Sequence, residues 1–202
     1  MRLKIVQVGE PVLRERARPL SMEEIDSDVI GRLIADMRET MYDAPGVGLA
    51  APQVGLSLQL VVLEDREDWL KDIAAEQLAE RERRPVPFQV IINPRIVERS
   101  SAQVEFFEGC LSLAGFSAAV PRARQVRVEC LDERGEPRII EASGWYARIL
   151  QHEIDHLLGN VYIDRMRSRT LTSLDNFSRY WRAKRIDDVL AELRSTDEPA
   201  SE

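Results

Sequence analysis

The sequence predicts an α+β protein with a single domain, in which mixed or antiparallel sheets surround a long helix near the end of the chain. Most segments rich in Val, Ile and Leu precede that helix and do not alternate regularly with other helices, as they would in a doubly wound sheet. The chain has 202 residues, 44% hydrophobic and 31% charged, which suits one globular core.

The N-terminal third is predicted to contain a strand and then an amphipathic helix. "RLKIVQV" reads as the strand. Ser21 and Glu24 in "SMEE" have the spacing of a capping box, which starts a helix. Pro45 and Gly46 in "DAPGVG" end it. Between these signals apolar residues recur every four positions, at Ile25, Val29, Leu33, Met37 and Met41.

Three later segments, "LQLVVL", "QVIINP" and "RQVRVECL", are predicted strands, and "RGEP" (Arg134–Pro137) is a predicted turn. The charged segment Glu64–Arg84 reads as a surface insertion with helical propensity between the first two of these strands. Further helices are expected over about residues 144–158 and 173–194, followed by a disordered tail, "STDEPASE".

Composition excludes several classes of function. No stretch approaches the roughly 18 apolar residues of a membrane helix, and we expect no signal peptide at "MRLKIVQVGEP". A net charge of −7 argues against DNA binding. Two cysteines in a chain of this length do not form a disulfide scaffold, so a reducing cytoplasm is expected.

"LQHEIDHLL" contains both histidines of the chain, His152 and His156, in the pattern HExxH. In a helix, residues four apart lie about 40° from each other, so both imidazoles can bind one metal ion. Glu153 lies about 100° from His152, which is badly placed for a ligand but within reach of a metal-bound water. This pattern pairs a metal with a general base. We therefore expect the late helix to be a central metal-binding helix.

No third histidine remains, so the third ligand is a carboxylate, Cys110 or Cys130. Cys130 shares one face of a predicted strand with Val126 and Val128, which is typical of a buried core residue. Cys110 follows Gly109 among polar residues, and with the two histidines it leaves a fourth position open for water. A closed structural site with both cysteines is the alternative, although they lie 20 positions apart.

A third segment, "GVGLAAPQVG" (Gly46–Gly55), lacks the Lys-Ser/Thr of a phosphate loop. Its glycines allow close backbone approach to a ligand, although a helix stop and a tight turn also explain them. The side-chain amide of Gln53 is a donor suited to an oxyanion.

"GVGLAAPQ", "EGCLS" and "QHEIDH", in this order, resemble the three signature motifs of the peptide deformylase family. The resemblance extends from about Val6 to about Met166. It implies a hydrolase that removes the formyl group from the N-terminal formyl-methionine of nascent polypeptides and releases formate. Residues 1–166 are the expected catalytic domain, and residues 167–202 are the expected helical extension and disordered tail.

The resemblance also assigns roles to single residues. It implies that one divalent metal ion, typically ferrous iron with zinc or nickel as substitutes, is bound by Cys110, His152 and His156. It further implies that the acid/base is Glu153, that the oxyanion donors are Gln53 and the backbone N–H of Leu111, and that Gly48 lines the substrate strand. In this mechanism the metal lowers the pKa of its bound water, whose proton Glu153 takes and later delivers to the leaving amine.

Trp145 and Ile149 lie on the same helix face as the two histidines. With Val47 and Phe106, we expect them to form the pocket for the methionine side chain, and ordinary core packing is the alternative. Asp155 points to another side of the helix and is expected to form salt bridges. Two rival functions stay open: a zinc endopeptidase and a metal-binding module without catalysis.

The segment Arg165–Arg185 contains seven basic residues and one acid, a net +6 in a chain of net −7. Because a deformylase meets its substrates at the ribosomal exit, we expect this segment to dock on the ribosome through phosphates. The alternative is a helix packed on the body with solvated arginines.

Overall fold

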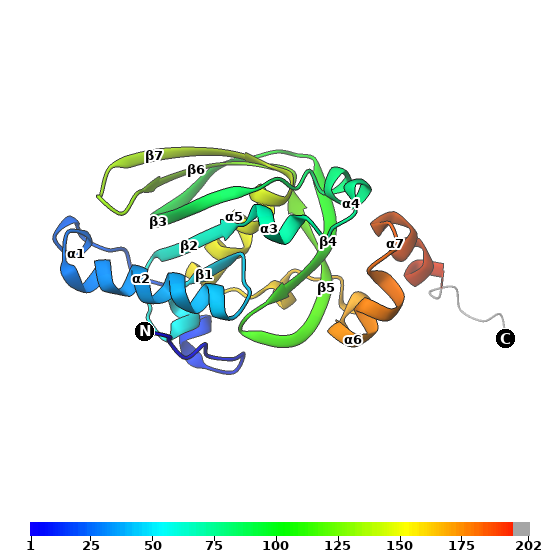
Figure 1. The fold of residues 1–202 in the computed structure, drawn as a ribbon, viewed down its shortest axis with the longest axis horizontal. Helices are drawn as coiled ribbons and strands as arrows, with labels where there is room; N and C mark the ends of the chain where they lie inside the picture. The colour runs from blue at the N-terminus through cyan, green and yellow to red at the C-terminus, as the bar shows by residue number, and fades with distance from the viewer. Residues whose placement is uncertain (196–202) are drawn as a thin grey trace.

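The computed structural model describes residues 1–195, which form two antiparallel sheets around helix α5 (Gly144–Leu157) (Figure 1). Helix α5 contacts strands of both sheets. The predicted α+β class, the antiparallel sheets and the central late helix are therefore confirmed.

The larger sheet has the strand order β1-β2-β3-β6-β7, and the smaller sheet has the order β4-β5-β8. All pairs of neighbouring strands in them are antiparallel. The strands of the larger sheet are β1 (Gly48–Ala50), β2 (Leu60–Asp65), β3 (Val86–Arg99), β6 (Gln125–Leu131) and β7 (Pro137–Ser143). Those of the smaller sheet are β4 (Gln103–Cys110), β5 (Leu113–Ala123) and β8 (Thr172–Ser173).

The helices other than α5 lie mainly before β1, inside the predicted insertion and at the C-terminal end of the described chain. They are α1 (Met22–Ile25), α2 (Asp28–Asp43), α3 (Glu67–Leu70), α4 (Ala75–Glu80), α6 (Leu174–Asn176), the π-helical turn η5 (Phe177–Trp181) and α7 (Ile186–Ser195). Four short 3-10 turns are η1 (Pro11–Arg14), η2 (Ala51–Val54), η3 (Tyr162–Asp164) and η4 (Ser168–Thr170). The insertion predicted between two strands is thus confirmed, with α3 and α4 between β2 and β3.

Two hydrophobic clusters explain this arrangement. The first joins α5 to the larger sheet, where Leu150 and Ile154 pack with Val61 and Val128. The second joins α2 to the sheet through Met37, which is fully buried. Burying these side chains is the main favourable term in folding, and it fixes α5 beneath the strands.

Two predictions for the N-terminal part are wrong. "RLKIVQV" is not a strand, because its N–H groups bond to separate elements: Leu3 N–H to Thr40 Oγ1 (2.9 Å) and Val6 N–H to Gln53 O (2.9 Å). The capping box of Ser21 is present, but the helix after it ends at Ile25. Ser27 then caps a second helix, α2, which leaves Val29 65% exposed.

The predicted C-terminal helix over residues 173–194 is also wrong as one continuous element. Residues 182–185 form a turn between η5 and α7. Of the predicted disordered tail, residues 196–202 lie outside the described residues. None of the helices described in residues 1–195 combines the length and apolar character needed to cross a membrane.

The cap of α2 can be tested by replacing Ser27. Its Oγ accepts from Ile30 N–H at 3.3 Å, so Ser27→Ala should lower the free energy of unfolding by about 1 kcal/mol. Ser27→Asp keeps an acceptor for Ile30 N–H but loses the hydrogen bond that Ser27 Oγ donates to Glu24 O at 2.6 Å, so it should recover part of the stability. Urea unfolding followed by circular dichroism measures both. Equal stability of Ser27→Ala and the unchanged protein would contradict the assigned cap.

Candidate active site

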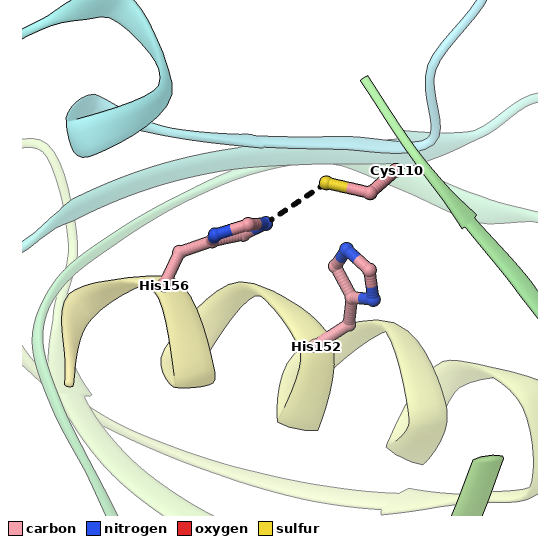
Figure 2. Close-up of side chains that lie close together, drawn as sticks. All are labelled: Cys110, His152 and His156. Atoms are coloured by element: carbon pink, nitrogen blue, oxygen red, sulfur yellow. Dashed lines mark hydrogen bonds between the residues drawn. The ribbon is translucent and has the colours of Figure 1, made fainter. Parts of the chain in front are cut away.

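The structure brings together three side chains with metal-binding atoms: Cys110, His152 and His156 (Figure 2). Cys110 is the last residue of β4, and the two histidines project from one face of α5. Their possible ligand atoms all lie within 4.8 Å of one another. The Sγ of Cys110 is 3.3 Å from Nε2 of His156. One thiolate and two imidazoles converging on one point leave a fourth position open.

The hydrogen bond of His152 suits a metal ligand. Its Nδ1 lies 2.9 Å from Oε2 of Glu108, and because a carboxylate only accepts, Nδ1 carries a proton and Nε2 is the ring nitrogen that can bind an ion. Although burial opposes protonation, Cys110 and Glu108 raise the pKa of this imidazole well above its ordinary value, so an ion that binds Nε2 would displace a proton. Burial lowers the pKa of His156 well below its ordinary value, so its imidazole is neutral, as metal binding requires. The donor set therefore fits a divalent metal.

Cys130 is not part of this group. It lies on β6 in the core cluster with Val126 and Val128, as the sequence pattern predicts. Burial raises the pKa of its thiol to about 11, which disfavours the thiolate that a metal needs. Among the described residues, the closed site with both cysteines therefore finds no geometric support.

Sequence reasoning missed a buried charge network behind His152. Both oxygens of Glu108 are bound by Arg122, at 2.9 and 3.0 Å, and Arg148 Nη1 donates to Oε1 at 2.6 Å. Although burial opposes ionisation, Arg122 and His152 lower the pKa of the Glu108 carboxyl well below its usual range. Asp155, expected to form salt bridges, is bonded by Arg122 and Arg165. The signal in the sequence was charged residues inside apolar strand and helix segments.

Glu153 lies beside the three converging side chains and is 4% exposed. Its Oε2 has no hydrogen-bond partner among the described residues. Burial raises the pKa of its carboxyl to about 7, which is suited to proton exchange near neutral pH. A Cβ at Gly48 would lie 2.3 Å from Oε1 of Glu153, so only glycine fits at this point of β1.

The amide of Gln53 is held in one orientation. Its Oε1 accepts from Ala50 N–H at 2.9 Å, while its Nε2 donates to Ser112 Oγ at 3.3 Å and lies 3.5 Å from Cys110 Sγ. The N–H groups therefore face the cysteine. Leu111 follows Cys110 in the turn between β4 and β5, so its backbone N–H belongs to the same part of the chain as the ligand.

A cavity of about 200 Å³ opens beside the site. Its lining includes four of the five residues predicted for substrate binding, Val47, Gly48, Trp145 and Ile149, together with the two predicted oxyanion donors, Gln53 and Leu111. Phe106 is not among them and instead packs edge-on against Trp145, with ring centroids 6.3 Å apart. Trp145 thus stands between Phe106 and the cavity.

Comparison with known proteins identifies the family of the chain. A family model described as polypeptide deformylase matches residues 2–171. Peptide deformylase 1A of Arabidopsis thaliana, chloroplastic/mitochondrial, is 48% identical over 173 residues, 86% of this chain and 64% of that protein. The Thermus thermophilus peptide deformylase is 47% identical over 159 residues, 78% of this chain and 79% of that protein.

Solved structures share the fold. The Met-Ala-Ser bound class I type b peptide deformylase from Acinetobacter baumannii matches with a TM-score of 0.74 and 32% identity, over 82% of this chain and 99% of that one. The chain therefore belongs to the polypeptide deformylase family. It spans 64% and 62% of the lengths of its Arabidopsis thaliana and Solanum lycopersicum relatives, less than two thirds.

The two cysteines give opposite expectations for metal content. Cys110→Ala removes a converging ligand atom, so its metal affinity should fall by at least about tenfold and its metal content after dialysis should be lower. Cys130→Ala should keep its metal and lose only modest stability, since it removes one buried sulfur. Mass spectrometry of bound metal checks both variants. Unchanged metal in Cys110→Ala would show that another group completes the site.

Proposed function

We propose that this chain is a metal-dependent hydrolase that removes the formyl group from N-terminal formyl-methionine of nascent polypeptides. Water and the formyl amide give formate and a free amine. The observation that carries this proposal is the convergence of Cys110, His152 and His156 beside the buried, unpartnered oxygen of Glu153. A solved relative from Acinetobacter baumannii is described as bound to Met-Ala-Ser, a peptide that begins with methionine.

In this proposal Cys110, His152 and His156 hold one divalent ion. Ferrous iron is the proposed native metal because the resemblance to the family implies it, and zinc or nickel are proposed substitutes, since a thiolate and two imidazoles accept all three. When bound, the ion supplies Lewis-acid activation of water and of the formyl oxygen. The Glu108 carboxylate holds the ring of His152 in the orientation that this binding needs.

The protein side chains then move the protons and stabilise charge. Glu153 takes the proton of the attacking water at Oε2 and delivers it to the leaving nitrogen. Gln53 Nε2 and the backbone N–H of Leu111 donate to the oxyanion that develops on the formyl oxygen. The fixed orientation of the Gln53 amide supports this role, because its acceptor oxygen is already bonded to Ala50 N–H.

The cavity supports a small substrate group. Because Gly48 has no side chain, the backbone of β1 lies against Glu153. In this proposal an extended peptide lies along β1, beside the site. Trp145, Ile149 and Val47 form the apolar wall for the methionine side chain, with Phe106 behind Trp145. A cavity of about 200 Å³ has room for one side chain, whereas an endopeptidase needs a long cleft for its substrate.

We further propose that residues 1–166 act as the catalytic domain and that residues 167–202 are its extension, of which the described part, residues 167–195, packs on that domain. The cytoplasm is the proposed location, because Cys110 must stay reduced to bind a metal and both cysteines are free. A metal-binding module without catalysis would not need Glu153, so the effect of replacing Glu153 distinguishes that rival function from this proposal.

A formate-release assay with anaerobically purified protein and a formyl-Met peptide tests the activity. Glu153→Gln should keep its metal and lose turnover by at least about 100-fold, because the amide takes no proton from water. Gln53→Ala should keep its metal and slow turnover by a comparable factor, as lost oxyanion donors do. Near-normal turnover by metal-loaded Glu153→Gln would end the proposed mechanism, and no formate from the unchanged protein would end the proposed activity.

We also propose that Arg165–Arg185 docks on the ribosome. Arg179 and Arg182 are exposed and lie next to exposed Tyr180, which supports contact with RNA phosphates and bases. Other basic residues of the segment have partners. Arg165 pairs with Asp155, Arg167 with Glu105, Lys184 with Glu192 and Arg185 with Glu80, and Arg169 also has an interaction within the protein. The binding we propose therefore rests chiefly on the pair Arg179 and Arg182.

Charge reversal tests this docking without removing packed residues. Arg179→Glu/Arg182→Glu should weaken co-sedimentation with ribosomes and flatten its salt dependence, because phosphate contacts are lost. Arg32→Glu/Arg134→Glu changes the net charge equally at exposed sites elsewhere and should sediment normally. Formate release should not change in the control variant. Equal sedimentation of the two variants, or none for the unchanged protein at low salt, would contradict ribosome docking.

A further inference from the structure

Trp145, the second residue of α5, has an indole ring that no hydrogen bond orients. Its ring lines the cavity, while its Nε1 is buried and has no partner among the described residues. Buried indole N–H groups usually find an acceptor. The orientation of this ring therefore depends on the side chains packed around it.

Those side chains include three guanidinium groups. The guanidinium carbons of Arg81, Arg83 and Arg148 lie 5.4, 5.2 and 5.9 Å from the ring centroid of Trp145. Guanidinium groups at such distances attract an aromatic face. Arg148 belongs to α5 itself and is bonded to Glu108, whereas Arg81 and Arg83 come from the insertion between β2 and β3. The insertion thus reaches the ring from outside the catalytic helix.

Close contacts with β2 and α5 fix the end of the insertion, residues 81–83. Arg83 binds both oxygens of Asp65, at 2.7 and 2.8 Å, and this pair is almost fully buried. A Cβ at Gly144 would lie 2.4 Å from Cβ of Glu82 and 2.9 Å from Arg81 O. Gly144 also has a φ of +58°, which favours glycine. The insertion therefore packs closely against the first residue of α5, directly before Trp145.

The C-terminal segment, residues 174–195, packs against the insertion (Figure 1). Gln77 of α4 donates to Arg182 O at 2.8 Å, and Ile186 N–H donates to Glu80 at 3.3 Å. Trp181 and Arg81 line one small cavity behind Phe106. The residues behind Trp145 are thus enclosed by two segments that lie far apart in the sequence.

We propose that Arg81 and Arg83 are positioning residues that fix the Trp145 ring and so determine which first side chains of a formyl-peptide enter the pocket. This inference rests on the proposed function and assigns a role to the insertion. The two arginines do not touch the substrate. They limit the width of the pocket by preventing the ring from tilting away from the cavity.

The kinetic test compares formyl-Met and formyl-Phe peptides. Arg83→Met alone strips buried Asp65 of its partner and destabilises the fold, so Asp65→Asn/Arg83→Met and Arg81→Met carry the test. Both should lower kcat/KM for formyl-Met by about tenfold, mainly through KM, and raise the relative use of formyl-Phe, since a pocket contact discriminates by about this factor. Arg84→Met, at the exposed neighbouring position, is the matched control and should match the unchanged protein. Metal content should be equal in all.

A second readout does not need activity. In protein labelled with 5-fluorotryptophan, the ¹⁹F resonance of Trp145, assigned with Trp145→Phe, should shift or broaden in both test variants and stay unchanged in Arg84→Met. If the unchanged protein releases no formate, the proposed function fails while this spectrum still tests the contact with the ring. An unmoved Trp145 resonance overturns the inference. A moved resonance with unchanged preference between the two peptides overturns the claim about specificity.

Discussion

The hydrogen bond from His152 Nδ1 to Glu108 is the interaction on which the rest of the site depends. It decides that Nε2 of His152 faces Cys110 and an incoming ion. Glu108 can stay ionised in this buried position only because Arg122 and Arg148 form ion pairs with its carboxylate. Breaking such a buried pair by removing one partner typically costs about 3–5 kcal/mol, so the network links metal binding to fold stability.

The fold gathers these groups from three separate parts of the chain. The β4–β5 hairpin contributes Cys110 and Glu108, helix α5 contributes the histidines with Glu153, and the β1–η2 segment contributes Gly48 and Gln53. Because α5 contacts strands of both sheets, small shifts of either sheet would separate the ligand atoms. Rigid packing around α5 is therefore a condition for metal binding, and the insertion with its C-terminal support extends that rigidity to the cavity wall.

Sequence alone predicted what depends on local spacing. The helix that carries His152 follows from a periodicity of 3.6, and the position of Cys130 on the buried face of a strand follows from a periodicity of 2. It did not predict β5, because alanine, glycine and proline in "LAGFSAAVPRA" have low strand propensity and form a strand through pairing with β4. Nor did it predict the partners of Glu108, since Arg122 and Arg148 lie 14 and 40 residues away. Contacts at such separations arise only in the folded chain.

X-ray absorption spectroscopy of the zinc-loaded protein counts the sulfur and nitrogen ligands of the metal, and therefore tests whether Cys110, His152 and His156 bind it. An open site made of these three residues should give one sulfur at about 2.3 Å and two imidazole nitrogens at about 2.0–2.1 Å, with a light atom completing the shell. The sulfur should disappear in Cys110→Ser and remain in Cys130→Ser. A shell with two sulfurs, or with none, would contradict the open site built from one cysteine and two histidines.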